Sequence, residues 1–199
     1  MAQTKNGNTK ERIIEAAWEL FYEKGYDNTT VDEIIQACGV SKGGFYHYFH
    51  AKDDLLTSLS FLLDSQYEAA MQQLDPEMNS YEKLLYLSRY LFRYIEERVP
   101  VDILSLVYST QVVKRGKKYL LDQNRVYYKV LNTILKEGQE RGQIIQDKSL
   151  AELAKFYALQ ERAVLYDWCI CEGSYSLASY GMDILSFFVG PMKAPEKLK

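Results

Sequence analysis

Helical periodicity is the feature that most limits the folds open to this chain of 199 residues. Apolar residues recur at three- and four-residue steps, as where Ile13, Ala17 and Phe21 fall on one face of a helix. The chain has 11 Gly and 4 Pro, and so few helix-breaking residues favour long helices over many short strands. The sequence therefore predicts an all-α protein of about nine helices.

Capping signals give the expected helix limits. Thr30-Val-Asp-Glu33 and Ser149-Leu-Ala-Glu152 each place a carboxylate three residues after a hydroxyl, which is the capping box that begins a helix. Gly25 is expected to close the first helix. The predicted helices are Thr9–Lys24, Thr30–Cys38, Ser41–Phe49, Lys52–Leu74, Asn79–Arg98, Val101–Val113, a helix from Gly116 to Arg141, Ser149–Cys171 and Tyr175–Val189.

The spacing of these helices predicts two domains. The first three helices are short and close together, which indicates an N-terminal helix-turn-helix domain over residues 1–56. The later helices are mostly longer and indicate a larger helical domain over residues 57–199. Hydrophobic residues make up 47% of the chain, which is enough to build a buried core.

Charge and cysteine content narrow the compartment and the partners. The net charge is −3, so a protein that coats nucleic acid through a broad basic surface is disfavoured. No apolar run approaches the ~20 residues that span a bilayer, and the polar first residues lack a secretory signal. Three cysteines without paired spacing argue against a disulfide framework and fit a reducing cytoplasm. We expect a cytoplasmic protein that has no membrane partner.

Nothing in the sequence points to catalysis, a cofactor or a metal. No G-x-S-x-G, phosphate-binding loop or dinucleotide fingerprint is present. The two histidines, His47 and His50, both lie beside one short helix and leave little for a metal site. Cys169 and Cys171 could form a thiol sensor, but helical positions two apart point in different directions, and buried, inert thiols are the preferred interpretation.

The helix-turn-helix carries the functional prediction. Gly39-Val40 forms the turn between its two helices, and the second helix of such a unit presents its first residues to base edges in the major groove. Free N–H groups in that first turn can meet phosphate. Adjacent glycines there cost a helix about 1 kcal/mol each relative to alanine, so stability does not explain their presence. The first-turn residues are Ser41, Lys42, Gly43 and Gly44.

The two faces of this helix have different expected roles. Phe45, Tyr48 and Phe49 share one face and are expected to point into the core. Tyr46 and His47 lie toward the other face, together with Lys42. From Ser41 to Lys52 the chain has two Lys, two His and no acid, so an acidic protein keeps one window free of negative charge. The alternatives are a three-helix bundle that does not bind DNA, and a core role for His47.

The same segment resembles the TetR (tetracycline repressor) family. The resemblance covers roughly residues 9–56. The departure from the family pattern is Ala51, because the family usually has Ser or Asn there as a helix cap. The matching residues are Phe21, Gly25-Tyr26, Thr29-Thr30-Val31, Gly39-Val-Ser-Lys-Gly-Gly-Phe-Tyr-His-Tyr-Phe49 and Lys52-Asp-Asp-Leu-Leu56.

The resemblance implies a transcriptional repressor that binds double-stranded, palindromic operator DNA as a homodimer, with one DNA-reading head in each subunit. Phosphate contacts are implied for Thr30, Tyr46, Tyr48 and Lys52. Positions at or near base edges are implied for Lys42, Gly43, Gly44 and His47.

Tyrosines suggest a ligand pocket in the larger domain, which has 13 of the 17 tyrosines from about residue 57 onward. Each one alone is explained by helix packing, but an aromatic interior with polar tips fits an aromatic or amphipathic small molecule. The resemblance implies that such an effector releases the DNA. The candidate effector residues are Tyr90, Tyr94, Tyr108, Tyr127, Tyr128 and Gln160.

The last two helices are apolar enough to suggest a subunit interface. The expected helix Ser149–Cys171 is apolar on nearly every side and must be buried. Two such helices from each subunit would form a four-helix interface, which is the dimer mode that the resemblance implies; burial in a monomer core is the alternative. Two other functions remain as competitors: an enzyme using the tyrosine-rich cavity, and an interaction protein whose helix-turn-helix is vestigial.

Overall fold

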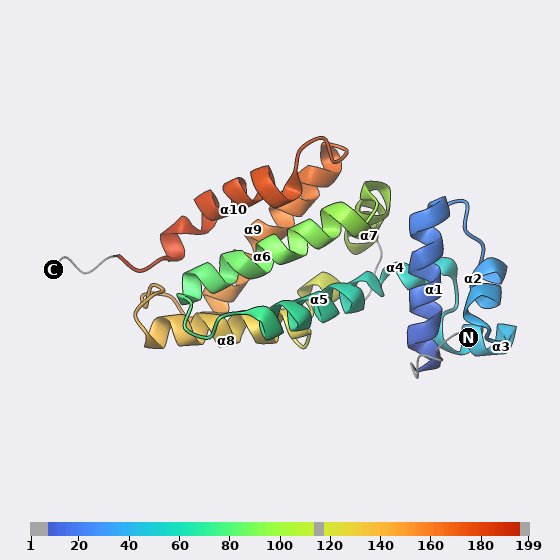
Figure 1. The fold of residues 1–199 in the computed structure, drawn as a ribbon, viewed down its shortest axis with the longest axis horizontal. Helices are drawn as coiled ribbons and strands as arrows, with labels where there is room; N and C mark the ends of the chain where they lie inside the picture. The colour runs from blue at the N-terminus through green and yellow to red at the C-terminus, as the bar shows by residue number, and fades with distance from the viewer. Residues whose placement is uncertain (1–7, 114–117, 196–199) are drawn as a thin grey trace. The chain divides into compact units, whose positions relative to one another are not determined.

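The computed structural model describes residues 8–113 and 118–195, which form ten α-helices without an extended strand (Figure 1). The all-α prediction is therefore confirmed. Contacts along the backbone divide the chain into two compact units, Met1–Ser60 and Phe61–Lys199. This division falls a few residues after the boundary expected at residue 56.

The first unit has a small apolar core enclosed by four helices. α1 spans Thr9–Lys24, α2 Val31–Cys38, α3 Lys42–Tyr48 and α4 Lys52–Leu56. Gly25 ends α1 with φ of 80°, and Gly39 ends α2 in the left-handed region with φ of 64°, as a glycine at a helix end allows. The side chains with no exposed surface in this core are Ile13, Ala17, Phe21, Ile34, Phe45 and Leu55.

The prediction of one long helix over Lys52–Leu74 is wrong. The chain forms α4 and then α5, which spans Leu59–Gln73, and the helix is interrupted at Thr57 and Ser58. Both hydroxyls donate to carbonyls three residues back, Thr57 to Asp54 and Ser58 to Leu55. Such side-chain bonds compete with the regular helical pattern. Ser58 Oγ also accepts a 2.8 Å hydrogen bond from the indole of Trp18.

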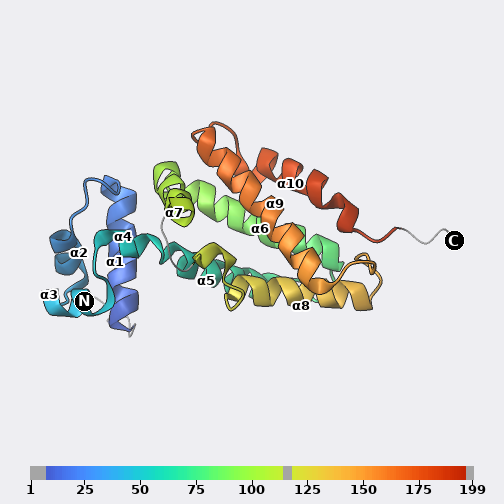
Figure 2. The ribbon, with the colours of Figure 1, turned by 180° about the vertical axis from the view of Figure 1, so that it is seen from behind.

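The second unit is a bundle built around α6. Its further helices are α6 (Ser80–Arg98), α7 (Val101–Val113), α8 (Val126–Glu140), α9 (Leu150–Ile170) and α10 (Met182–Val189). α6 packs against α8 and α10, and α9 packs against α7, α8 and α10. Figure 2, seen from behind, shows α9 crossing the bundle between α8 and α10.

Two expected helices begin later than predicted. Gly116, expected to precede a helix, lies outside the described residues; a 3-10 turn covers Tyr119–Leu121, and α8 begins at Val126. Asp122 Oδ1 accepts from the backbone of Asn124 at 3.1 Å, an Asx turn that delays the helix. The last expected helix is divided into a π-helical turn, Leu177–Gly181, and α10.

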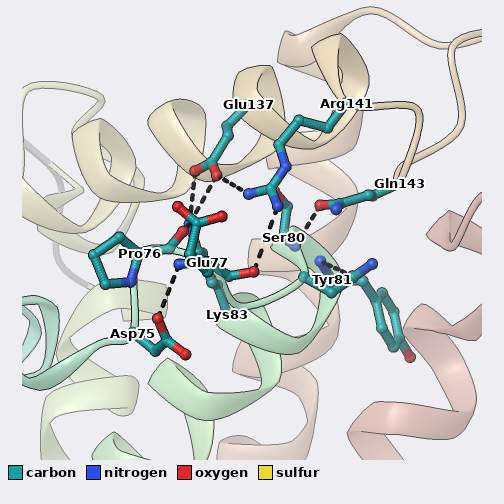
Figure 3. A network of polar contacts seen from close by, with 10 residues as sticks. Asp75, Pro76, Glu77, Ser80, Tyr81, Lys83, Glu137, Arg141 and Gln143 are labelled. Carbon is teal, nitrogen blue, oxygen red and sulfur yellow. Dashed lines mark hydrogen bonds and ion pairs between the residues drawn. The ribbon is translucent and has the colours of Figure 1, made fainter.

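A polar network fixes the start of α6 against the end of α8 (Figure 3). The buried Lys83 ammonium lies 2.7 Å from Glu137 Oε1 and 2.7 Å from the carbonyl of Pro76. The Lys83 ammonium and the Arg141 guanidinium lower the pKa of Glu137 through hydrogen bonds. Gly138 permits the close approach beneath the network, because a Cβ there would lie 2.5 Å from Ile144 Cδ1.

Candidate functional site

The surface of α3 presents the polar residues expected to meet DNA. Lys42 has a side chain that is 68% exposed, and Tyr46 is 41% exposed. His47 is also exposed, so the alternative of a core histidine is wrong. Phe45 and Phe49 anchor the helix from behind with 0% and 4% exposure. α3 is therefore a short, anchored helix whose outer face is basic and aromatic.

Tyr48 departs from its expected position. The periodicity placed it on the core side with Phe45 and Phe49, but it is 37% exposed. Its ring packs edge-on against His47 with centroids 4.7 Å apart. Phe45 and Phe49 are four residues apart and both enter the core, whereas Tyr48 falls at the edge of their face of the helix. An exposed Tyr48 agrees with the phosphate contact that the resemblance implies.

The first turn of α3 is open where DNA would approach. Ser41 Oγ accepts from Gly44 N at 3.0 Å and caps the helix. A Cβ on Gly43 would have no neighbour within 4 Å, whereas one on Gly44 would lie 3.2 Å from Ser41 Oγ. Gly44 is thus explained by its own cap, while no packing among the described residues explains Gly43.

Thr30 and Lys52 are both engaged inside the first unit. The Thr30 hydroxyl accepts from Glu33 N and donates to Glu33 Oε2 at 2.9 Å, so it forms half of the expected capping box. The Lys52 ammonium donates to the carbonyls of Tyr26 at 2.7 Å and Thr29 at 2.9 Å. It also lies 4.1 Å from the centre of the Tyr26 ring. These bonds fasten the start of α4 to the turn between α1 and α2.

The missing cap at Ala51 is replaced from within α4. Asp54 Oδ2 accepts from the backbone N–H of His50 at 2.8 Å and from that of Ala51 at 3.2 Å. A carboxylate in the first turn also interacts favourably with the helix dipole. The substitution at Ala51 therefore leaves α4 with a defined start.

The acidic residues beside α3 neutralise little of its positive charge. Asp32 lies 3.5 Å from the Lys42 ammonium, and both side chains are well exposed, so this ion pair contributes little. Glu33 points to Lys24 instead, at 2.8 Å. Hydrogen bonds from Lys24 and Thr30 lower the pKa of Glu33 to about 2.

The predicted effector residues do not form one cavity. Tyr90 and Tyr94 line an open groove between α5 and α6. Tyr108 lines a hollow of about 340 Å³ with mostly apolar walls, to which Arg162 and Lys118 also contribute. Tyr127 lies in a buried cluster around Glu161.

The two remaining effector candidates are not among the residues that line these hollows. Tyr128 is buried, donates to the carbonyl of Leu120 and accepts from Arg162, each at 3.2 Å. Gln160 is half-buried on α9. The assignment of all six residues to an effector therefore stays a prediction.

Glu161 is a buried carboxyl that the sequence analysis did not single out. Ser88 Oγ lies 2.6 Å from Glu161 Oε1, and the Tyr67 hydroxyl donates to Oε2 at 3.2 Å. The Tyr127 hydroxyl lies in the same cluster, buried and without a well-formed hydrogen bond to any described residue. Burial raises the pKa of Glu161. A signal was available, since Glu161 is an acid within the apolar face of α9.

The number of protons available to this cluster also bears on the charge of Glu161. The Tyr157 hydroxyl lies 2.8 Å from the carbonyl of Leu84 and 2.6 Å from Ser88 Oγ. With the contact from Ser88 to Glu161, these are three oxygen–oxygen contacts in series, and each needs one proton. The two hydroxyls supply two of these protons, since each carries one. The third would come from the carboxyl, so this arrangement and burial both favour the protonated form of Glu161, whose pKa is raised above its ordinary value.

Large apolar side chains remain exposed on α9 and α10, where a subunit interface was expected. Phe187 is 80% exposed, and a gathering of such residues marks a contact surface. Cys169 is buried and Cys171 half-buried, and both thiols are free. The other large apolar side chains exposed on these helices are Phe156, Leu159, Tyr166, Ile170 and Phe188.

The described part of the chain has no candidate metal site and no candidate membrane span. Residues 8–113 and 118–195 hold no group of three His, Cys, Asp or Glu side chains placed to bind a metal. Among the same residues, every helix is too short or too polar to cross a bilayer.

Comparison with known proteins matches both parts of the chain. The family profile described as bacterial regulatory proteins, tetR family, matches residues 13–59. The HTH-type transcriptional regulator YuxN of Bacillus subtilis is 53% identical over 47 residues, which are 24% of this chain and 16% of that protein. The chain therefore spans about a sixth of that relative's length.

Two longer matches cover nearly the whole chain. The fatty acid metabolism regulator protein of Bacillus subtilis is 28% identical over 187 residues, 89% of this chain and 92% of that protein. The crystal structure of Thermus thermophilus FadR, a TetR family transcriptional repressor in complex with lauroyl-CoA, superposes with a TM-score of 0.74 at 26% identity. This superposition covers 96% of this chain and 98% of that one. These similar proteins are named as a transcriptional regulator, a regulator of fatty acid metabolism and a transcriptional repressor.

Proposed function

Because the chain belongs to the TetR family of bacterial regulatory proteins, we propose that it is a homodimeric repressor that binds a palindromic operator and is released by an amphipathic effector. The observation that carries this proposal is the outer face of α3, where Lys42, Tyr46 and His47 are exposed while the phenylalanines behind them are buried. The first turn of such a helix reads base edges, and exposed basic and tyrosine side chains hold phosphates.

The exposed apolar side chains of α9 and α10 support the dimer. Covering Phe187 and Ile170 with a second copy removes apolar area from water at roughly 25 cal/mol per Å². In a dimer, two α3 helices would enter successive major grooves ~34 to 36 Å apart.

We propose a fatty acyl-CoA as the effector. The support is the likeness to Thermus thermophilus FadR, a repressor bound to lauroyl-CoA, and to the fatty acid metabolism regulator protein. An acyl chain suits the mostly apolar hollow of about 340 Å³ around Tyr108, which lies within the ~300 to 1,000 Å³ usual for ligand pockets.

The test measures binding to the DNA upstream of the chain's own or a neighbouring gene. Lys42→Ala with Tyr46→Ala should abolish a sequence-specific, salt-dependent shift, because lost phosphate contacts weaken binding and flatten its salt dependence. The matched control is Lys129→Ala with Tyr22→Ala, which removes an exposed lysine and tyrosine elsewhere. Sedimentation equilibrium should give a dimer for all three proteins. Unchanged DNA affinity in the first variant overturns the assigned surface.

The effector is tested on the same complex. Lauroyl-CoA should lower operator affinity at least tenfold, which needs ~1.4 kcal/mol of differential binding. An operator affinity that lauroyl-CoA leaves unchanged would rule out release by this ligand.

A further inference from the structure

The groove between α5 and α6 has a composition unlike the apolar hollow around Tyr108. Its volume is about 460 Å³. Side chains from α6 form one wall, and two glutamines of α5 form the other. The residues that line it are Gln66, Gln73, Tyr86, Arg89, Tyr90, Arg93, Tyr94 and Glu97.

Two arginines give the groove an unused positive charge. Arg89 and Arg93 are one helical turn apart and exposed. Within residues 8–113 and 118–195, neither guanidinium makes a hydrogen bond or an ion pair. A guanidinium binds phosphate in a bidentate manner. Glu97 is the acid among the lining residues, so the groove is net positive in a chain of net charge −3.

Three tyrosines form a ladder beside these arginines. Tyr86, Tyr90 and Tyr94 follow each other at one-turn intervals and are half-buried, so part of each ring faces the groove. Exposed aromatic rings next to arginines are the usual platform for a nucleobase. The amides of Gln66 and Gln73 line the same groove, and a glutamine amide can pair with the N6 and N7 edge of adenine.

We propose that this groove binds the phosphorylated adenosine end of coenzyme A, with adenine on the tyrosine ladder and phosphates on Arg89 and Arg93. The inference rests on the acyl-CoA effector proposed above and adds the place where its polar end is held. The acyl end needs no charge partner and is separate from this assignment. A free adenine nucleotide has the same chemistry, so the experiment distinguishes the two sources.

The experiment is calorimetric titration of the full chain with lauroyl-CoA, adenosine 3′,5′-bisphosphate and ADP. Adenosine 3′,5′-bisphosphate should compete with lauroyl-CoA. Arg89→Gln and Arg93→Gln should each weaken lauroyl-CoA binding on the order of tenfold, because each loses a charge-assisted hydrogen-bonded contact. The control is Arg98→Gln, an exposed arginine at the end of the same helix that does not line the groove. Its affinity should stay within twofold of the unchanged chain.

Each failure has its own signature. If the unchanged chain binds lauroyl-CoA and the double variant Arg89→Gln, Arg93→Gln binds it equally well, the groove assignment is wrong and the effector stands. If the unchanged chain binds no lauroyl-CoA, the effector and the groove assignment both fail. If ADP binds and lauroyl-CoA does not displace it, the groove is a site for free nucleotides and the coenzyme A assignment is overturned.

Discussion

The two units of this chain place their charged groups differently. In the described part of the first unit, charged side chains lie at or near the surface, and the core is made of apolar residues such as Phe21 and Phe45. In the second unit, Asp64 and Lys83 are buried and ion-paired. A surface charge is available to DNA and adds little to stability, whereas a buried charge depends on its partner. In the first unit, the charged residues that could bind DNA are therefore not the residues that stabilise the fold. In the second unit, charged residues form part of the core and contribute to its stability.

Breaking a buried ion pair in the second unit is expected to have the largest effect. Arg125 donates to both carboxylate oxygens of Asp64, at 3.2 Å and 2.7 Å, and both side chains are nearly buried. Arg125→Met leaves Asp64 without this pair and should lower the free energy of unfolding by about 3–5 kcal/mol, measured by urea denaturation. Adding Asp64→Leu should recover most of the loss.

The control for this prediction is an exposed pair in the same unit. Lys136 lies 3.9 Å from Glu140 one turn away, and both side chains are largely exposed. Lys136→Met should change the unfolding free energy by no more than about 0.5 kcal/mol. If the Lys136 and Arg125 variants cost the same, the contrast between buried and exposed charges would disappear.

An intermediate effect is expected from the buried carboxyl. Burial raises the pKa of Glu161 above its ordinary value of 4.5, so the folded chain retains a proton that the unfolded chain loses. The stability from this proton is full below pH 4.5 and is lost as pH rises through the folded pKa, with a slope of at most about 1.4 kcal/mol per pH unit. Glu161→Gln keeps a neutral donor toward Ser88 and removes this slope.

The measurement is urea denaturation of both proteins from pH 5 to pH 8. The variant should gain stability relative to the unchanged chain as pH rises. Parallel curves for the two proteins would mean that Glu161 is ionised in the fold and that the proton count is wrong.

The smallest effect on stability is expected on α3, where function should suffer most. A methyl at Gly43 meets nothing within 4 Å, so Gly43→Ala should raise the unfolding free energy by up to about 1 kcal/mol through helix propensity. The same methyl would stand between the helix and a DNA backbone or base edge. Operator affinity should fall while the melting temperature rises. An unchanged affinity would remove Gly43 from the DNA surface.

Local signals predicted the helix ends well in both units. The capping boxes at Thr30 and Ser149 and the glycine at the end of α1 occur as expected, because each depends on residues three or four positions apart. Tyr48 was placed on the wrong face, because the three-residue step from Phe45 puts it at the edge of the buried face and not within it. The DNA contacts of these residues remain predictions.

Contacts between distant residues account for what the sequence did not reveal. The helix break at Ser58 involves Trp18, 40 residues earlier, and the Glu161 cluster involves Tyr67, 94 residues earlier. Helical periodicity contains no information on such pairs. The effector tyrosines were predicted as one set for the same reason, and the fold distributes them over a groove, a hollow and a closed cluster.

The interruption at Thr57 and Ser58 has a mechanical consequence. An unbroken helix from Lys52 to Leu74 would act as a stiff rod that carries a rotation along its whole length. The actual chain has a two-residue joint, and the indole of Trp18 holds its second residue. Because Trp18 belongs to α1, its hydrogen bond to Ser58 anchors this joint to the core of the first unit and keeps the end of α4 from swinging freely.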